Sequence, residues 1–254
     1  MSWGFEIWWQ LPAVVAAGLA AGAGNAIAGG GSAISFPLLV FVGVPPVAAN
    51  ATNALGIVPG SAAAASSYRG ELRRARATTF FLLVPSLVGG ALGGWLLIRL
   101  PPEWFAAVAP WLVLLAAASV ALEPITRRWV GRGEETPVGR AGGVVFWFMV
   151  SLYGGYFGAG MGMFLLAALG LLGVHDLQHA NGLKNLLSVA IKAPAILYFI
   201  VLGLPVWTAA LALMAGATVG GWLAGHLIQR VSAQRLRGLV ALVGAALGLL
   251  MLVR

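Results

Sequence analysis

The stretch that decides the fold runs from residue 7 to residue 68 and reads IWWQLPAVVAAGLAAGAGNAIAGGGSAISFPLLVFVGVPPVAANATNALGIVPGSAAAASSY. Its 62 residues include no Asp, Glu, Lys or Arg. A helix that crosses the hydrocarbon core of a bilayer needs about 20 predominantly apolar residues. The stretch is therefore long enough for several membrane helices, which its glycine and proline residues are expected to separate.

The whole chain has the composition of a membrane protein. Of its 254 residues, 60% are hydrophobic and 9% are charged, whereas a soluble domain carries about 25% charged residues. The absence of cysteine excludes disulfides, thiolate catalysis and cysteine-ligated metal centres. The net charge of +8 does not indicate a nucleic-acid partner, because many of the basic residues gather in short segments between apolar runs, as in cytoplasmic loops.

We predict an all-α polytopic membrane protein with eight to ten helical segments, depending on how the short ones are counted. The predicted segments lie near residues 8–24, 31–43, 46–68, 77–99, 103–123, 140–155, 160–173, 178–201, 205–229 and 233–253. The first two, and likewise 140–155 with 160–173, are either full crossings or half-helices that end near the midplane.

Loop charges predict the orientation. Basic residues concentrate near 69–76, 127–140 and 230–237, whereas the connections at 43–46 and 201–205 carry no charge. Basic loops stay in the cytoplasm. Alternation of the segments then places both termini on the outer side.

Short motifs recur about 130 residues apart and indicate an internal duplication. The matched pairs are Ala28–Gly31 with Ala159–Gly162, Ala49–Asn50 with Ala180–Asn181, and Gly93–Leu96 with Gly220–Leu223. Equivalent loops differ in charge, so the two halves should be inverted relative to each other.

We therefore predict a first transmembrane repeat at 1–126, a basic cytoplasmic linker at 127–140 and a second, inverted repeat at 141–254. Inverted repeats with interrupted helices are typical of secondary transporters, which bind their substrate near the midplane between the repeats.

A polar stripe marks the segment 178–201. It consists of Asn181, Lys184, Asn185, Ser188 and Lys192, whose spacing places them on one face of a helix. A lysine at the centre of a membrane helix costs about 2.5–3.5 kcal/mol, so we expect an anionic substrate to neutralise Lys184. The alternative is that Lys184 extends its ammonium group to the interface. That alternative fits Lys192 less well, because Lys192 lies two turns deeper.

The duplication predicts a matching wall in the first half. Asn50 corresponds to Asn181 and Asn53 to Lys184, so Asn50, Thr52 and Asn53 are expected to face the stripe. An alternative role for Asn50 and Asn181 is to cap the starts of their helices.

Glycine-rich breaks precede two short apolar segments. Gly31 and Ser32 end the first of these breaks, and Gly162 ends the second. Backbone N–H groups at a helix start attract anions, so we include these three residues in the candidate substrate site. Close contact between helices is the alternative role of the glycines.

Enzymatic chemistry has little support in this sequence. His175, His179 and His226 are scattered, and metal coordination needs more ligands than they offer. The chain shows no paired carboxylates and no nucleophile–base spacing. We therefore expect no metal, no cofactor and no catalytic residues.

At these motifs the chain resembles the TauE/SafE family of sulfite and organosulfonate exporters, also called the toluene-sulfonate uptake permease family. The resemblance covers essentially the whole chain. It rests on Ala28-Gly29-Gly30-Gly31-Ser32 with Phe36-Pro37-Leu38, on Pro45-Pro46-x-x-Ala49-Asn50-Ala51-Thr52-Asn53 with Pro59-Gly60, and on Ala180-Asn181-Gly182-Leu183-Lys184-Asn185.

The resemblance implies a secondary carrier in the bacterial inner membrane for small sulfur-containing or organic anions, with export as the direction in the family's name. Lys184 or Lys192 could bind and release a proton that is coupled to transport, since a buried lysine titrates readily. A passive anion channel and a membrane assembly factor or enzyme without transport are the alternatives. The sequence leaves open whether the chain forms a homo-oligomer.

Overall fold

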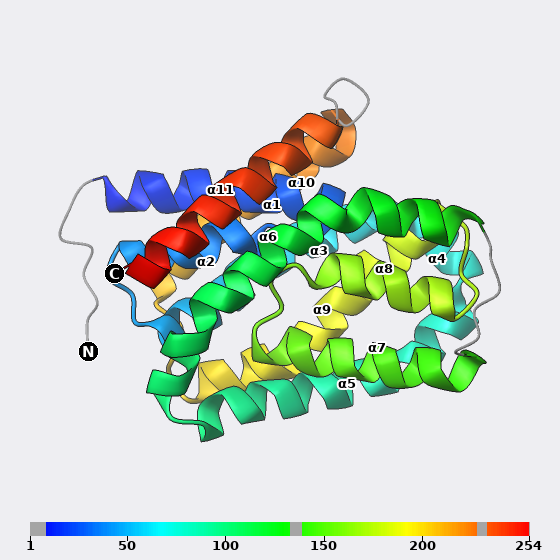
Figure 1. Ribbon diagram of the computed structural model, residues 1–254, viewed down its shortest axis with the longest axis horizontal. Coiled ribbons are helices and arrows are strands. Elements are labelled where there is room, and N and C mark those ends of the chain that lie inside the picture. The colour runs from blue at the N-terminus through cyan, green and yellow to red at the C-terminus, as the bar shows by residue number, and fades with distance from the viewer. Residues whose placement is uncertain (1–8, 133–138, 228–232, 254) are drawn as a thin grey trace.

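The computed structural model describes residues 9–132, 139–227 and 233–253, and every regular element in these ranges is an α-helix. Figure 1 shows the helices lying roughly along one common direction. Their bounds are α1 Gln10–Ala28, α2 Ser32–Phe41, α3 Pro46–Ser66, α4 Arg69–Arg74, α5 Arg76–Arg99, α6 Pro102–Arg132, α7 Gly139–Tyr156, α8 Met161–Leu171, α9 Leu177–Val201, α10 Trp207–Leu227 and α11 Ala233–Val253.

The predicted all-α polytopic fold is confirmed. Within the described ranges, α5, α6, α9 and α10 are long and apolar enough to cross a membrane, and α2, α7, α8 and α11 contain shorter apolar helices. The ten predicted segments correspond to ten of these helices. The eleventh, α4, lies within what was predicted to be a basic loop.

Two breaks interrupt the helices, one in each half. The first lies between α1 and α2, where Gly29 has a φ of +69°, and the second lies between α7 and α8, where Gly158 and Gly160 have φ of +72° and +71°. Left-handed backbone favours glycine because it has no Cβ. A side chain stabilises the second break, because the Tyr153 hydroxyl donates to the Ala159 carbonyl at 2.5 Å.

Helices of one half pack between helices of the other. α1 lies along α10, and α5 lies along α7. Gly22 of α1 is close enough to α10 that an added Cβ would overlap the Ala217 carbonyl, and one on Gly220 of α10 would overlap the Leu19 carbonyl of α1. Small residues spaced four apart let helix backbones approach closely in membranes. These close pairs join the two halves into one body.

The helix contacts follow a matched pattern. α1 contacts α10 as α7 contacts α5, α3 contacts α10 as α9 contacts α5, and α2 contacts α11 as α8 contacts α6. An inverted duplication would produce this pattern. The duplication and its division at 1–126, 127–140 and 141–254 remain predictions; α6 continues as helix to Arg132, inside the predicted linker.

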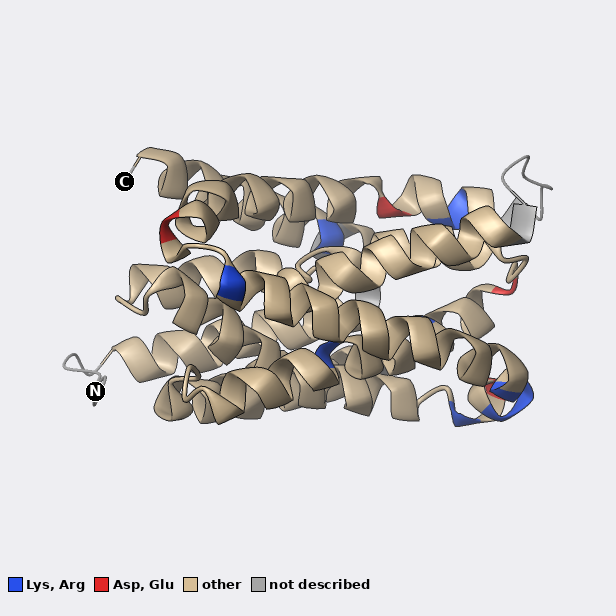
Figure 2. Ribbon diagram, turned by 90° about the horizontal axis from the view of Figure 1, so that it is seen from below, with Lys and Arg blue, Asp and Glu red and all other residues tan. Residues whose placement is uncertain are grey.

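The charged residues lie unevenly along the helix direction. α1 begins and α11 ends at one end of the molecule, and α4 lies at the opposite end (Figure 1). Figure 2 shows a concentration of basic residues at the α4 end and a few basic residues in the middle of the bundle. Which end faces the cytoplasm remains a prediction.

Candidate substrate-binding site

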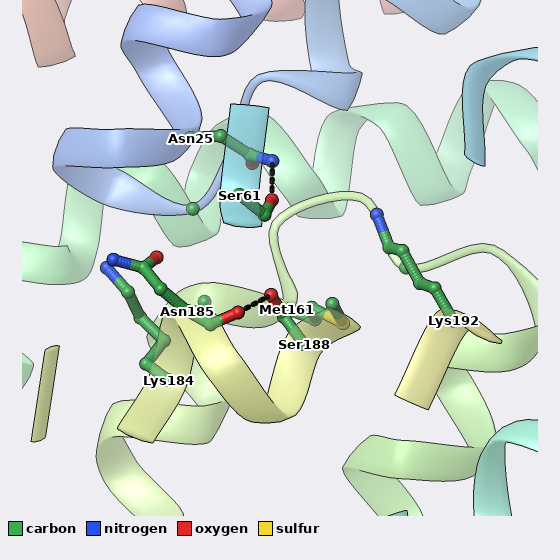
Figure 3. A pocket seen from close by; sticks show the side chains of 10 residues that line it. Asn25, Ser61, Met161, Lys184, Asn185, Ser188 and Lys192 are labelled. Atoms are coloured by element: carbon green, nitrogen blue, oxygen red, sulfur yellow. Dashed lines mark hydrogen bonds between the residues drawn. The ribbon is translucent and has the colours of Figure 1, made fainter. Parts of the chain in front are cut away.

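A small cavity lies where the two breaks meet α9 (Figure 3). Its walls come from α1, α3, both breaks, α8 and α9, and its lining residues are Asn25, Gly29, Ser61, Gly158, Met161, Gly162, Lys184, Asn185, Ser188 and Lys192. The space open to the centre of a water molecule is about 10 Å³. That is room for about one water molecule, so this conformation leaves no space for a larger ligand.

Lys184 and Asn185 bring unsatisfied donors to the cavity. Lys184 is 1% exposed, and neither its Nζ nor the Nδ2 of Asn185 has a hydrogen-bond partner in the described part of the chain. Both residues line the same cavity, and Figure 3 shows their side chains extending from neighbouring positions of α9. A buried ammonium group without an acceptor is costly. Within the described residues these two donors therefore have no acceptor, and a bound anion could supply one.

Lys192 and Ser188 continue the polar face of α9 along the cavity. Figure 3 shows Lys192 turned toward the loop of the second break, well away from Lys184. A Cβ added to Gly158 would lie 3.2 Å from the Lys192 Cε, so this glycine leaves room for the lysine stem. The Ser188 hydroxyl donates to the Asn185 carbonyl at 2.8 Å. The predicted stripe thus supplies four of the lining residues.

Asn25 and Ser61 form the wall contributed by the first half. The Asn25 Nδ2 donates to the Ser61 Oγ at 3.1 Å, and the Gly31 N–H donates to the Asn25 Oδ1 at 3.3 Å. Asn25 was not among the predicted site residues. The available signal was an isolated amide inside the apolar helix α1.

The three residues predicted for this wall lie outside the cavity lining. Asn50, Thr52 and Asn53 are buried, and each bonds to protein groups. The Asn50 Nδ2 donates to the Tyr156 carbonyl at 2.9 Å, the Thr52 Oγ1 accepts from the Val206 N–H at 2.9 Å, and the Asn53 Oδ1 accepts from the Ser35 Oγ at 2.5 Å. In this conformation these three side chains link α3 to neighbouring helices and helix ends.

The capping alternative for Asn50 and Asn181 is wrong. α3 begins at Pro46 and α9 at Leu177, with Asp176 as the N-cap of α9. Both asparagines therefore lie inside their helices. The Asn181 Nδ2 donates to the Leu177 carbonyl at 2.7 Å.

The two glycine breaks contribute differently. Gly162 lines the cavity, whereas Gly31 and Ser32 are buried outside its lining. The Gly31 N–H already donates to Asn25, and a Cβ on Gly31 would overlap the Ala21 carbonyl. Gly31 therefore serves close contact with α1, the alternative role considered for these glycines.

A charged cluster adjoins the cavity. The Glu123 side chain of α6 has no solvent exposure; its Oε1 pairs with the Arg127 Nε, and its Oε2 lies 2.6 Å from the Arg237 Nε of α11. The Arg127 Nη2 donates to the Asn181 Oδ1 at 3.3 Å. The segment predicted at 103–123 ended at this carboxylate. That boundary is corrected, because α6 continues past Glu123 to Arg132, and the two arginines compensate the charge of Glu123.

No group of three or more potential ligands gathers where a metal ion could bind within the described ranges. The His175 Nδ1 lies 3.0 Å from the Val130 carbonyl oxygen, which ties the loop before α9 to α6. The side chain of His226 lies outside the described residues.

Comparisons with known proteins agree with a membrane transporter. The sequence profile of the family described as "Sulfite exporter TauE/SafE" matches residues 14–251. A "Probable membrane transporter protein" of Haemophilus influenzae is 29% identical over 227 residues, covering 86% of this chain and 85% of the relative. "Probable membrane transporter protein ORF9" of Sinorhizobium sp is 26% identical, covering 90% of this chain and 87% of its own length. No solved structure matches the chain.

Proposed function

Because the chain belongs to the sulfite exporter TauE/SafE family of membrane transporters, we propose that it moves a small sulfur-containing or organic anion across the bacterial inner membrane by alternating access, in the export direction. Sulfite and short organosulfonates are the proposed substrate class. The proposed cytoplasmic side is the end that holds α4.

The observation that carries this proposal is the buried Lys184 ammonium group in the cavity. The unsatisfied Nδ2 of Asn185 lines the same cavity, and these two groups can only donate hydrogen bonds. Sulfite and sulfonate oxygens are acceptors with negative charge. Binding such an anion would satisfy both donors and neutralise the lysine, which favours an anionic over a neutral substrate.

The size of the cavity favours alternating access over an open pore. Its space accommodates about one water molecule, which is too little for a sulfonate. The helices around it must therefore separate to admit substrate, and a binding site between repeats that rock against each other does this.

A binding experiment on purified protein tests the proposal. A ligand that binds only the folded state raises its stability by RT ln(1 + [L]/Kd). Sulfite or sulfoacetate should raise the unfolding temperature of wild-type protein and of Arg73→Ala, a control that removes an exposed positive charge on α4. Neither anion should stabilise Lys184→Ala. Equal stabilisation of Lys184→Ala and wild type would contradict the assignment of Lys184.

Flux into proteoliposomes separates the carrier from the channel alternative. A carrier saturates with substrate and shows counterflow, because each cycle moves a bound anion. We expect both for sulfite or sulfoacetate. Flux that rises linearly with concentration and shows no counterflow would favour a passive anion channel.

A further inference from the structure

The charged cluster beside the cavity pairs a single carboxylate with two arginines. Glu123 is fully buried and is shared between Arg127 of its own helix and Arg237 of α11. The arginine side chains are 24% and 14% exposed. The carboxylate is therefore the most deeply buried member of the cluster, and both arginine side chains are partly exposed.

The cluster lies next to Lys184 on the side of the α4 end. Arg127 contacts Asn181, which precedes Lys184 by one turn of α9. α4 packs against α9, and Gly182 lies against Tyr68 and Leu72. Glu123, Arg127 and Arg237 are all close enough to act electrostatically on Lys184.

Among the described residues, Lys184, Arg127 and Arg237 bring three positive charges to the side of the cavity that faces α4. The Lys184 Nζ has no hydrogen-bond partner in the described part of the chain, whereas Arg127 and Arg237 both pair with the Glu123 carboxylate. We propose that Arg127 and Arg237 form a second binding site for the transported anion, between the cavity and the α4 end, and that the Glu123 carboxylate occupies this site in the conformation described here. The inference rests on the proposed anion transport.

The geometry gives this arrangement a function. Glu123 joins α6 to α11, and Arg127 joins α6 to α9. An anion that enters between the arginines replaces the carboxylate, so the links between these helices loosen as the substrate arrives. Arginine suits this exchange because its guanidinium group binds carboxylates and sulfonates through the same pair of N–H donors.

Replacing Glu123 with glutamine tests the inference. Glu123→Gln removes the internal anion while keeping the shape, so the affinity for sulfite and sulfoacetate, measured by thermal stabilisation and direct binding, should rise roughly ten-fold. Glu103→Gln, at an exposed position near the start of the same helix, should leave the affinity unchanged. Glu123→Asp keeps the charge on a side chain too short to bridge both arginines, so it should raise the affinity by a smaller factor. This variant replaces Glu123→Gln as the test if the glutamine variant does not fold.

The results separate the inference from the proposed function. A folded Glu123→Gln or Glu123→Asp protein with wild-type or weaker affinity overturns the second site, because a purely structural ion pair would alter stability alone. If Lys184→Ala abolishes binding while the Glu123 variants leave it unchanged, the proposed function stands and this inference falls. If Lys184→Ala binds like wild type while Glu123→Gln gains affinity, the arginine site stands without Lys184.

Discussion

Gly29 and Gly162 touch where the two breaks meet. A Cβ built on Gly29 would lie 2.5 Å from the Cα of Gly162, closer than real Cβ atoms approach a backbone. Gly29 also has a φ of +69°, a conformation that costs other residues about 1–2 kcal/mol. Both residues line the cavity. Glycine is therefore required at residue 29 for its backbone conformation and for its lack of a side chain.

Gly29→Ala should destabilise the protein and distort the cavity. The left-handed conformation costs about 1–2 kcal/mol, and forcing a methyl group against backbone adds about 1–3 kcal/mol. Gly43→Ala is the matched control, because Gly43 has a φ of +96° and nothing within 4 Å of an added Cβ. Thermal unfolding in detergent should show a larger loss for Gly29→Ala. Equal losses would mean that the contact with Gly162 adds nothing.

The capping carboxylate of α9 predicts a pH dependence of stability. The backbone N–H of His179 donates to the Asp176 Oδ1 at 2.8 Å and lowers the pKa of that carboxyl group. A lowered folded-state pKa stabilises the fold above the unfolded value of about 3.9, and the stabilisation disappears as the pH falls through the folded-state value. Asp176→Ala should therefore lose about 1 kcal/mol at neutral pH and less in strong acid, where the protonated carboxyl group still accepts the hydrogen bond but carries no charge.

The control for this prediction is Asp176→Asn, which keeps an acceptor oxygen but carries no charge. Its unfolding temperature relative to that of Asp176→Ala should not change between neutral and acidic pH. A difference between wild type and Asp176→Ala that stays undiminished in strong acid would show that the carboxylate charge does not contribute.

Helix positions were predictable because they depend on properties of single segments. Apolar runs end at glycine, proline or charged residues, so the predicted segment 178–201 differs from α9 by one residue at its start. The α9 wall of the site was predictable for a related reason. A helical spacing places Lys184, Asn185, Ser188 and Lys192 on one face whatever packs against it.

The opposite wall was not predictable because it depends on how helices cross. Matching the halves predicted Asn50 and Asn53 to line the site, but those side chains bond to the Tyr156 carbonyl and to Ser35. Asn25 reaches the cavity because α1 ends beside α3, where its amide meets Ser61. Glu123 was missed because its partner Arg237 lies in another helix, more than 100 residues away in sequence. A periodic pattern within one helix carries no information about such contacts between helices.

Replacing Asn25 with aspartate should place a competing anion in the cavity. The fold should tolerate Asn25→Asp, because a carboxylate can accept from both groups that now contact the amide, the Gly31 N–H and the Ser61 hydroxyl. The new negative charge would face the wall that holds Lys184 and repel an anionic substrate. We expect sulfite and sulfoacetate to bind at least roughly ten-fold more weakly, by direct binding measurements. Gln178→Glu, which adds the same charge at an exposed position of α9, should bind like wild type. If both variants keep wild-type affinity, the anion does not bind beside Asn25, and the cavity would not be the substrate site.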